Sequence, residues 1–133
     1  MNPTQNNTAT PRLLFLDDLR NPADCLHYMG NRKNVEVSIY QKEWHVVRTY
    51  VEFVSWIETN GLPDFISFDH DLADFDDDNM KEHSGMDCAK WLVEYCLDHK
   101  LTCPDFAVHS ANPAGADNIA ALLNNFKRMT ERK

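Results

Sequence analysis

Residues 13–18 read LLFLDD, a short apolar run that ends in the two acids Asp17 and Asp18. A brief continuous apolar run is typical of a strand buried in a parallel sheet that helices cover on both faces. The same pattern returns twice, as FISFDHD at residues 65–71 and as FAVHS at residues 106–110. Because such sheets bind ligands beyond the carboxyl ends of their strands, we expect the polar residues after these runs to meet in one crevice.

The segments between the runs carry the signals of helices. Residues 21–24 (NPAD) and 112–114 (NPA) each place an asparagine cap before a proline at the first helical position. Residues 49–52 (TYVE) have the spacing of a capping box. Apolar residues three and four apart, from 88 to 96 and from 119 to 126, predict the buried faces of two helices. Strands that alternate with helices predict a three-layer α/β domain with a mostly parallel sheet of four or five strands.

Three segments are less regular. We expect residues 1–11 to form a disordered tail and residues 12–133 to form a single domain. Residues 35–40 alternate apolar and polar and residues 44–48 are also strand-like, so they form either a hairpin or one strand beside a loop. The acidic segment at residues 74–78 lacks the glycine and glutamate of an EF-hand calcium loop, which favours a solvated loop or a lid.

The composition of the 133-residue chain argues against several classes of protein. No apolar run reaches the roughly 18 residues of a membrane span. The net charge of −8 disfavours an extended nucleic-acid surface, whose affinity would come from lysine and arginine. The four cysteines form no CxxC pair, so we expect reduced thiols and a cytoplasmic protein.

The acids after the first two runs predict a metal site. Carboxylates that lie close together repel one another unless a cation or a proton lies among them. We expect Asp17, Asp18 and Asp69 to hold a divalent metal ion through oxygen ligands, with Mg²⁺ preferred and Mn²⁺ as the second choice. Alternation points Asp71 the same way as Asp69, so either acid can be the nucleophile or base, and either can face the metal. Taken alone, the first acidic pair is equally consistent with an Asx-turn that ends a strand.

Four other polar residues suit a phosphate group. His109 is a candidate general acid that protonates the leaving oxygen, or a metal ligand, because imidazole titrates near neutral pH. Ser110 can donate a hydrogen bond to a phosphoryl oxygen. Arg20 is a candidate phosphate clamp or an ion-pair partner of Asp18. The helix start at Asn112 directs backbone N–H groups at an anion, although Asn-Pro is also ordinary capping chemistry.

These residues resemble those of the flavodoxin-like receiver fold of response regulators. In receivers, an acidic pair after the first strand and a central aspartate hold Mg²⁺, the central aspartate accepts a phosphoryl group, and a serine or threonine contacts it. The resemblance implies these roles for Asp17 and Asp18, for Asp69 and for Ser110. The usual last strand of receivers, with its lysine, is missing from this sequence.

A closer resemblance is to the family of cyclic-phosphate-processing receiver-like domains. It extends from about residue 13 to residue 123 and includes Asp71 and His109, which ordinary receivers do not require. The motifs that carry it are LDDLRNP at residues 16–22, FDHDL at residues 68–72, GMD at residues 85–87 and HSANPAGA at residues 109–116.

The family resemblance implies a metal-dependent phosphoesterase that acts on a cyclic phosphate, such as an RNA 2′,3′-cyclic phosphate end or a cyclic nucleotide. Its partner is then a phosphate-containing small molecule or an RNA end, and no membrane is involved. Two alternatives stay open. One is a non-catalytic receiver-like binding module, for example one encoded by a phage, and the other is a true phospho-acceptor modified on Asp69.

Overall fold

Four parallel strands form the central sheet, in the order β2-β1-β3-β6. The computed structural model describes residues 11–28, 37–72, 74–75, 82–110 and 112–131, so most of the predicted tail lies outside the described residues. The strands are β1 (Leu13–Leu16), β2 (His45–Val47), β3 (Phe65–Phe68) and β6 (Asp105–Val108). Strands joined through helices confirm the predicted receiver-like α/β fold.

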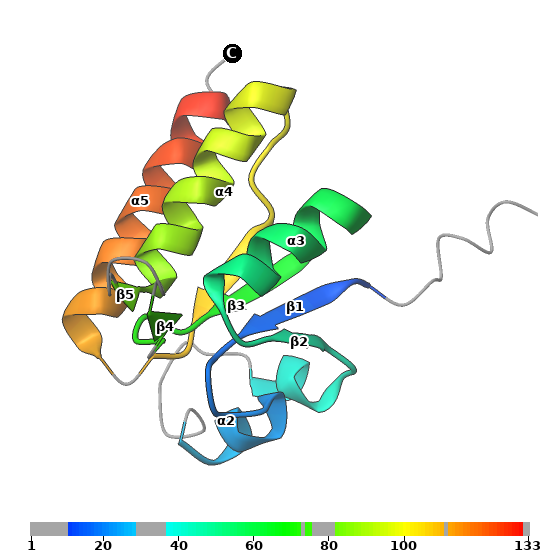
Figure 1. Cartoon of the computed structure of the whole chain (residues 1–133), viewed down its shortest axis with the longest axis vertical. Helices are drawn as coiled ribbons and strands as arrows, with labels where there is room; N and C mark the ends of the chain where they lie inside the picture. The colour runs from blue at the N-terminus through cyan, green and yellow to red at the C-terminus, as the bar shows by residue number, and fades with distance from the viewer. Residues whose placement is uncertain (1–10, 29–36, 73, 76–81, 111, 132–133) are drawn as a thin grey trace, which may run out of the picture.

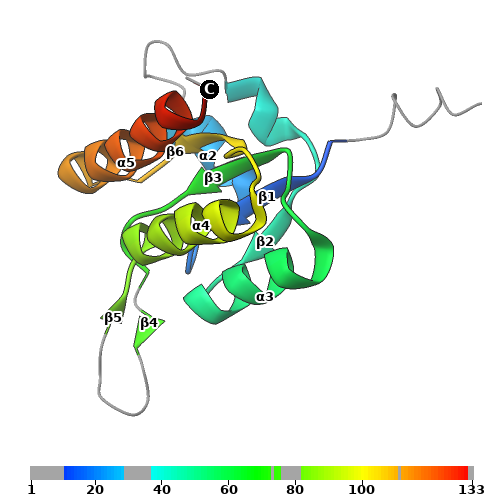
Figure 2. The same cartoon turned by 90° about the horizontal axis from the view of Figure 1, so that it is seen from above.

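Helices cover both faces of this sheet (Figure 1). They are α2 (Pro22–Tyr28), the 3₁₀-helix η2 (Val37–Gln41), α3 (Tyr50–Asn60), α4 (Gly85–His99) and α5 (Pro113–Glu131). The main core joins one face of the sheet to α3, α4 and α5, and its members include Phe53, Leu92 and Leu123, all fully buried. A smaller core on the other face holds Phe15 and Cys25, beneath α2 and η2 (Figure 2).

Of the two alternatives for residues 35–48, the hairpin is wrong, and a single strand after a non-strand segment is what the structure shows. Residues 37–41 form η2, residues 35–36 lie outside the described residues, and β2 pairs with β1 in parallel. The reason is long-range packing, because Tyr40 is buried against Phe15 in an edge-to-face contact. The indole of Trp44 also donates a hydrogen bond to the carbonyl of Ile39, which closes the turn after η2.

Local capping fixes the starts of α3 and α4. Thr49 accepts a hydrogen bond from the backbone N–H of Glu52, as predicted, while the Glu52 side chain bonds the N–H of Arg48, one residue before the cap. Ser84 and Asp87 form a complete capping box at α4 that was not among the predicted caps. Between β3 and α4 lie two short antiparallel strands, β4 (Asp74–Phe75) and β5 (Glu82–His83), so the start of the predicted acidic loop is a strand, and residues 76–78 lie outside the described residues.

The cysteines and the helices bear on two expectations that were drawn from the composition. All four cysteines are buried free thiols, as expected for a protein without disulfides. Among the described helices, none combines the length and the apolar character that crossing a bilayer requires.

Backbone hydrogen bonds continue one residue past three strands and align their ends. The N–H groups of Asp17, Asp69 and His109 donate to carbonyls of the neighbouring strands, at 3.2, 2.9 and 2.9 Å. These residues follow Leu16, Phe68 and Val108, which are paired in register across the sheet. Because side chains alternate along a strand, the three residues share the face that carries Phe15 and Ser67.

Two glycines make room for the segment that carries Asp69. Gly85 donates its N–H to the carbonyl of His70, at 2.7 Å, and a Cβ on Gly85 would lie 1.8 Å from the carbonyl oxygen of Asp69. A Cβ on Gly115 would lie 2.4 Å from the ring of His70. The starts of α4 and α5 therefore hold this strand end between them, at a distance that only glycine permits.

We predict that Gly85→Ala destabilises the protein by about 1–3 kcal/mol, because the new methyl group must displace backbone atoms of Asp69. Replacing glycine by alanine in a helix usually increases the free energy of unfolding, but here the steric clash outweighs that increase. Urea unfolding measures the change, with the exposed Lys90→Ala in the same helix as a control expected within about 0.5 kcal/mol of the parent. A Gly85→Ala variant as stable as the parent contradicts the close packing.

Candidate metal centre

Asp17, Asp69 and His109 converge as predicted, since one ligand atom from each lies within 4.8 Å of the others. All three side chains are buried. A pocket of about 170 Å³ opens beside them and is lined by Asp17, Asp18, Leu19, Arg20, Asp69, Asp71 and Ser110. Of the six other predicted site residues, four line this pocket and two, His109 and Asn112, do not.

Asp17 is the most firmly held acid of the site. Its Oδ1 accepts hydrogen bonds from the backbone N–H groups of Leu19 and Arg20, at 2.9 and 2.8 Å. Its Oδ2 lies 3.0 Å from Nε2 of His109. Burial alone would raise the pKa of Asp17, but these hydrogen bonds outweigh burial and lower it to about 2. Asp17 therefore forms the turn that the sequence offered as one alternative, and the same side chain also lines the candidate site.

Asp69 has the opposite electrostatic environment. Burial, followed by the negative charges of Asp17 and Asp18, raises the pKa of Asp69 to about 6. A hydrogen bond from Ser110 lowers it in part. A cation beside these carboxylates would remove the repulsion, and oxygen donors of this kind suit Mg²⁺ or Mn²⁺. The donor set therefore fits a hard divalent cation.

Asp18 and Arg20 form the outer wall of the pocket. Asp18 is exposed, and partial burial together with the neighbouring charge of Asp17 raises its pKa. The guanidinium of Arg20 has Nη1 4.0 Å from Oδ2 of Asp17, with the side chain 37% exposed. Arg20 thus lies where a phosphate entering the pocket would meet a positive charge.

Asp71 and Asn112 occupy the rim on the side of α5. Oδ1 of Asp71 lies 2.8 Å from Nδ1 of His70, and its Oδ2 accepts a hydrogen bond from the Asn112 amide at 3.3 Å. The bond with His70 lowers the pKa of Asp71, so this exposed carboxylate is ionised over a wide pH range. Asn112 also accepts from the N–H of Gly115 and thereby caps α5, so it holds Asp71 and the helix rather than lining the pocket.

His109 lies behind the pocket rather than in its wall. The ring is fully buried and stacks on Phe15, with the centroids 4.4 Å apart. Nδ1 lies 2.7 Å from Oγ of Ser67, while Nε2 faces Asp17. The general-acid role of His109 stays a prediction.

Sequence reasoning missed Arg48, which fastens the loop that carries the acidic pair. Its Nη1 donates to the carbonyls of Asp17 and Arg20, at 3.1 and 2.6 Å, and its Nη2 donates to Oδ1 of Asn21 at 2.7 Å. Arg48 directly follows β2, so its position after a strand end was the available signal. Ser67 and Tyr40 were also missed, because only the register and the placement of η2 bring them to His109.

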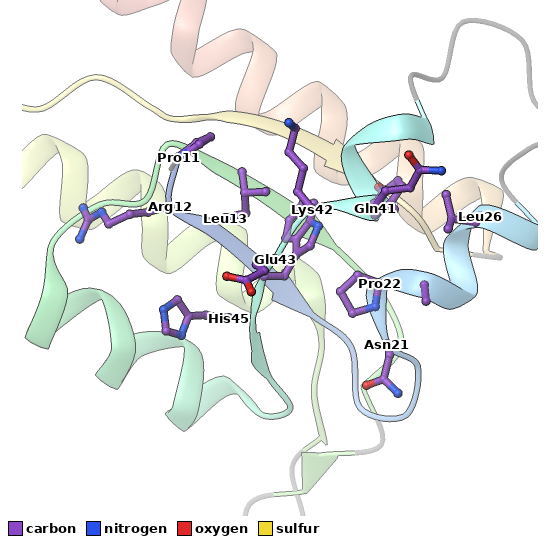
Figure 3. A pocket seen from close by; sticks show the side chains of 13 residues that line it. Pro11, Arg12, Leu13, Asn21, Pro22, Leu26, Gln41, Lys42, Glu43 and His45 are labelled. Atoms are coloured by element: carbon purple, nitrogen blue, oxygen red, sulfur yellow. The ribbon is translucent and has the colours of Figure 1, made fainter. Parts of the chain in front are cut away.

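A larger pocket, of about 950 Å³, lies elsewhere on the molecule (Figure 3). It lies against β1, η2 and the start of α2, and its polar side chains include Arg12, Lys42 and Glu43. None of the predicted catalytic or metal-binding residues lines it. The candidate site is therefore identified by its buried acids and not by the volume of its pocket.

We predict that the metal-free Asp69→Asn variant is more stable than the parent at pH 8 and equally stable at pH 4. The carboxyl has a pKa of about 6 in the folded protein and an ordinary pKa of 3.8, so the parent loses stability as pH rises between these values. The full loss above pH 6 is roughly 3 kcal/mol. Urea unfolding in EDTA at several pH values measures it.

Asp71→Asn is the matched control for this titration. The pKa of Asp71 is lowered, so its ionised form contributes stability above its ordinary pKa, and that contribution is lost as pH falls. The control should therefore be no more stable than the parent at pH 8. A lower stability of Asp69→Asn at pH 8 would show that its carboxylate is not under electrostatic strain.

Two solved structures share the fold of this chain. One is a fusion that carries the trimeric coiled coil of yeast Spc42, with a TM-score of 0.52, 14% identity, and coverage of 93% of this chain and 78% of that chain. The other is NtrX from Brucella abortus, with a TM-score of 0.51, 14% identity, and coverage of 93% of this chain and 26% of that chain. No curated protein matches the chain.

The family comparison covers most of the chain. The model of the cyclic-phosphate processing receiver domain matches residues 12–125. This range contains every strand of the central sheet and all of the acids that line the pocket. The chain therefore belongs to the family of cyclic-phosphate processing receiver domains.

Proposed function

We propose that this chain is a metal-dependent phosphoesterase that acts on a cyclic phosphate, such as an RNA 2′,3′-cyclic phosphate end or a cyclic nucleotide. The observation that carries the proposal is the cluster of Asp17, Asp18 and Asp69 around a small pocket that also presents Arg20 and Ser110. Membership of a cyclic-phosphate processing family supports the choice of substrate class.

Asp17, Asp18 and Asp69 are the proposed cation ligands. All are oxygen donors, which favours Mg²⁺, with Mn²⁺ as the second choice. When bound, such an ion polarises a phosphoryl oxygen or lowers the pKa of a water. The raised pKa of Asp69 in the protein alone is the electrostatic feature that a cation would reverse.

The remaining pocket residues are assigned to the phosphate and to proton transfer. Arg20 and Ser110 bind phosphoryl oxygens, and Asn112 places the start of α5 toward the same group. Hydrolysis adds a water oxygen to phosphorus and breaks one ring P–O bond. The attacking water gives up one proton to a base, and the leaving oxygen takes up one proton, for which His109 is the predicted donor. Asp71 is the better base for the water proton, since it is exposed and ionised, whereas Asp69 is buried and easily protonated.

The pocket limits what part of the substrate enters. About 170 Å³ holds roughly five water molecules at about 30 Å³ each, enough for a phosphate group but not for a nucleoside. The sugar and base must therefore lie outside. With a net charge of −8, the protein also repels long polyanions, which favours a small cyclic nucleotide or a short RNA end.

Turnover of 2′,3′-cyclic nucleotides tests the proposal. We expect hydrolysis with Mg²⁺ or Mn²⁺, none in EDTA, and a loss of about 100-fold or more in Asp17→Asn and Asp69→Asn, because removing a cation ligand removes charge stabilisation of the transition state. Asp98→Asn, an exposed acid of α4, is the matched control and should keep full activity. Absence of turnover by the parent with every added metal contradicts an esterase.

The two alternatives give distinct results in parallel measurements. A binding module shows no turnover, and its affinity for its partner is unchanged in Asp69→Asn. A phospho-acceptor gains the mass of one phosphoryl group on Asp69 after treatment with a small phosphodonor. The high pKa of Asp69 disfavours this second outcome in the absence of a cation, because a protonated carboxyl is a poor nucleophile.

A further inference from the structure

A continuous line of buried hydrogen bonds runs from the candidate site into the smaller core beneath α2 and η2, and we call it the buried relay. Oδ2 of Asp17 lies 3.0 Å from Nε2 of His109, and Nδ1 of the same ring lies 2.7 Å from Oγ of Ser67. Oγ of Ser67 lies 2.7 Å from the hydroxyl of Tyr40. The exposed fractions of the four residues are 1, 0, 0 and 2%.

The relay has only two possible directions, because each hydroxyl has one proton to donate. In the inward direction Tyr40 donates to Ser67, Ser67 donates to Nδ1, and Nε2–H donates to Asp17. In the outward direction Nδ1–H donates to Ser67, and Ser67 donates to Tyr40. A carboxylate only accepts hydrogen bonds, so Asp17 requires a proton on Nε2. For a neutral ring, this requirement allows the inward direction alone.

Charge favours the inward direction as well. Each O–H or N–H dipole then points its positive end toward the carboxylate of Asp17, and successive bonds polarise one another. In the outward direction the dipoles of Ser67 and Tyr40 point away from that negative charge. The ring of Tyr40 makes an edge-to-face contact with Phe15 and stacks on Trp44, and these two contacts fix its position.

We propose that Tyr40 and Ser67 are positioning residues that hold the ring of His109 in the Nε2–H form that Asp17 requires and, through it, the orientation of Asp17. This inference rests on the proposed function, because the oriented oxygen is a proposed cation ligand. His109 then hydrogen-bonds Asp17 and leaves metal binding to the carboxylates. Carboxylates that bind metals are commonly held in place by such an outer hydrogen-bonding group. The site consequently selects a cation that accepts oxygen ligands alone.

Packing shows that the relay is part of the fold and not a chance contact. His109 is stacked on Phe15 at an interplanar angle of 5°, so the ring cannot rotate away from its two partners without opening this core. Ser67 is the polar residue of a strand whose neighbours Ile66 and Phe68 are fully buried. A serine in such a place needs partners, and the relay supplies two of them.

Nitrogen-15 NMR of the histidine rings in metal-free protein tests the tautomer directly. We expect the parent to show His109 as a neutral ring with the proton on Nε2. Ser67→Ala should shift the Nδ1 resonance, because the ring loses its hydroxyl donor, while Tyr40→Phe, which keeps the aromatic packing, should shift it less. Tyr95→Phe, on α4 in the other layer, is the matched control and should leave His109 unchanged.

Mg²⁺ titration supplies the second readout. We expect Ser67→Ala to bind Mg²⁺ about 10-fold more weakly, in line with the usual effect of removing the outer partner of a ligand. At saturating Mg²⁺ its kcat should stay near that of the parent, and the parent should keep the proton on Nε2. Loss of that proton on Mg²⁺ binding overturns the proposal, since His109 would then be a ligand.

The two readouts separate failure of the relay from failure of the proposed function. A proton on Nδ1 in the metal-free parent, a doubly protonated ring, or unchanged His109 resonances in both variants overturns the relay, whether or not the protein is an esterase. Absence of Mg²⁺ binding by the parent overturns the proposed cation site. The single tautomer and its response to Ser67→Ala would still support the positioning of His109 by Ser67 and Tyr40.

Discussion

The parallel register of β1, β3 and β6 is the constraint on which the site depends. Leu16, Phe68 and Val108 are paired across the sheet, so the residues that follow them end at one level. Their backbone N–H groups remain bonded to the neighbouring strands, which leaves only the side chains free to vary. Two carboxyl groups and an imidazole thus meet although 92 positions separate Asp17 from His109.

The two faces of the sheet perform different tasks. The face beneath α3, α4 and α5 carries the apolar core and hence most of the hydrophobic stabilisation. The face beneath α2 and η2 is smaller and more aromatic, and it accommodates the hydroxyls of Ser67 and Tyr40 beside His109. A polar network is tolerable there because each member has a hydrogen-bond partner, which removes the cost of burying it.

The strand ends could be predicted because an apolar run that stops at an acid marks both the strand and its limit. The helix starts at residues 22 and 50 could be predicted for a similar reason, since capping chemistry is local. Residues 37–41 could not, because a short alternation fits a strand or a 3₁₀-turn equally well until Tyr40 is packed against Phe15. Ser67 is a single polar residue without a pattern, and Arg48 carries only the weak signal of following a strand, so the tertiary structure alone reveals their partners.

The contrast between Asp17 and Asp69 explains how a site with few positive charges can remain folded. Asp17 receives three hydrogen bonds and keeps its negative charge down to about pH 2. Asp69 is buried against that charge, so its own ionisation is resisted up to about pH 6. One acid is therefore a permanent anion, and the other can take up a proton when the pocket holds no cation. We infer that this inequality keeps the metal-free protein stable while leaving a second charge available for a divalent ion.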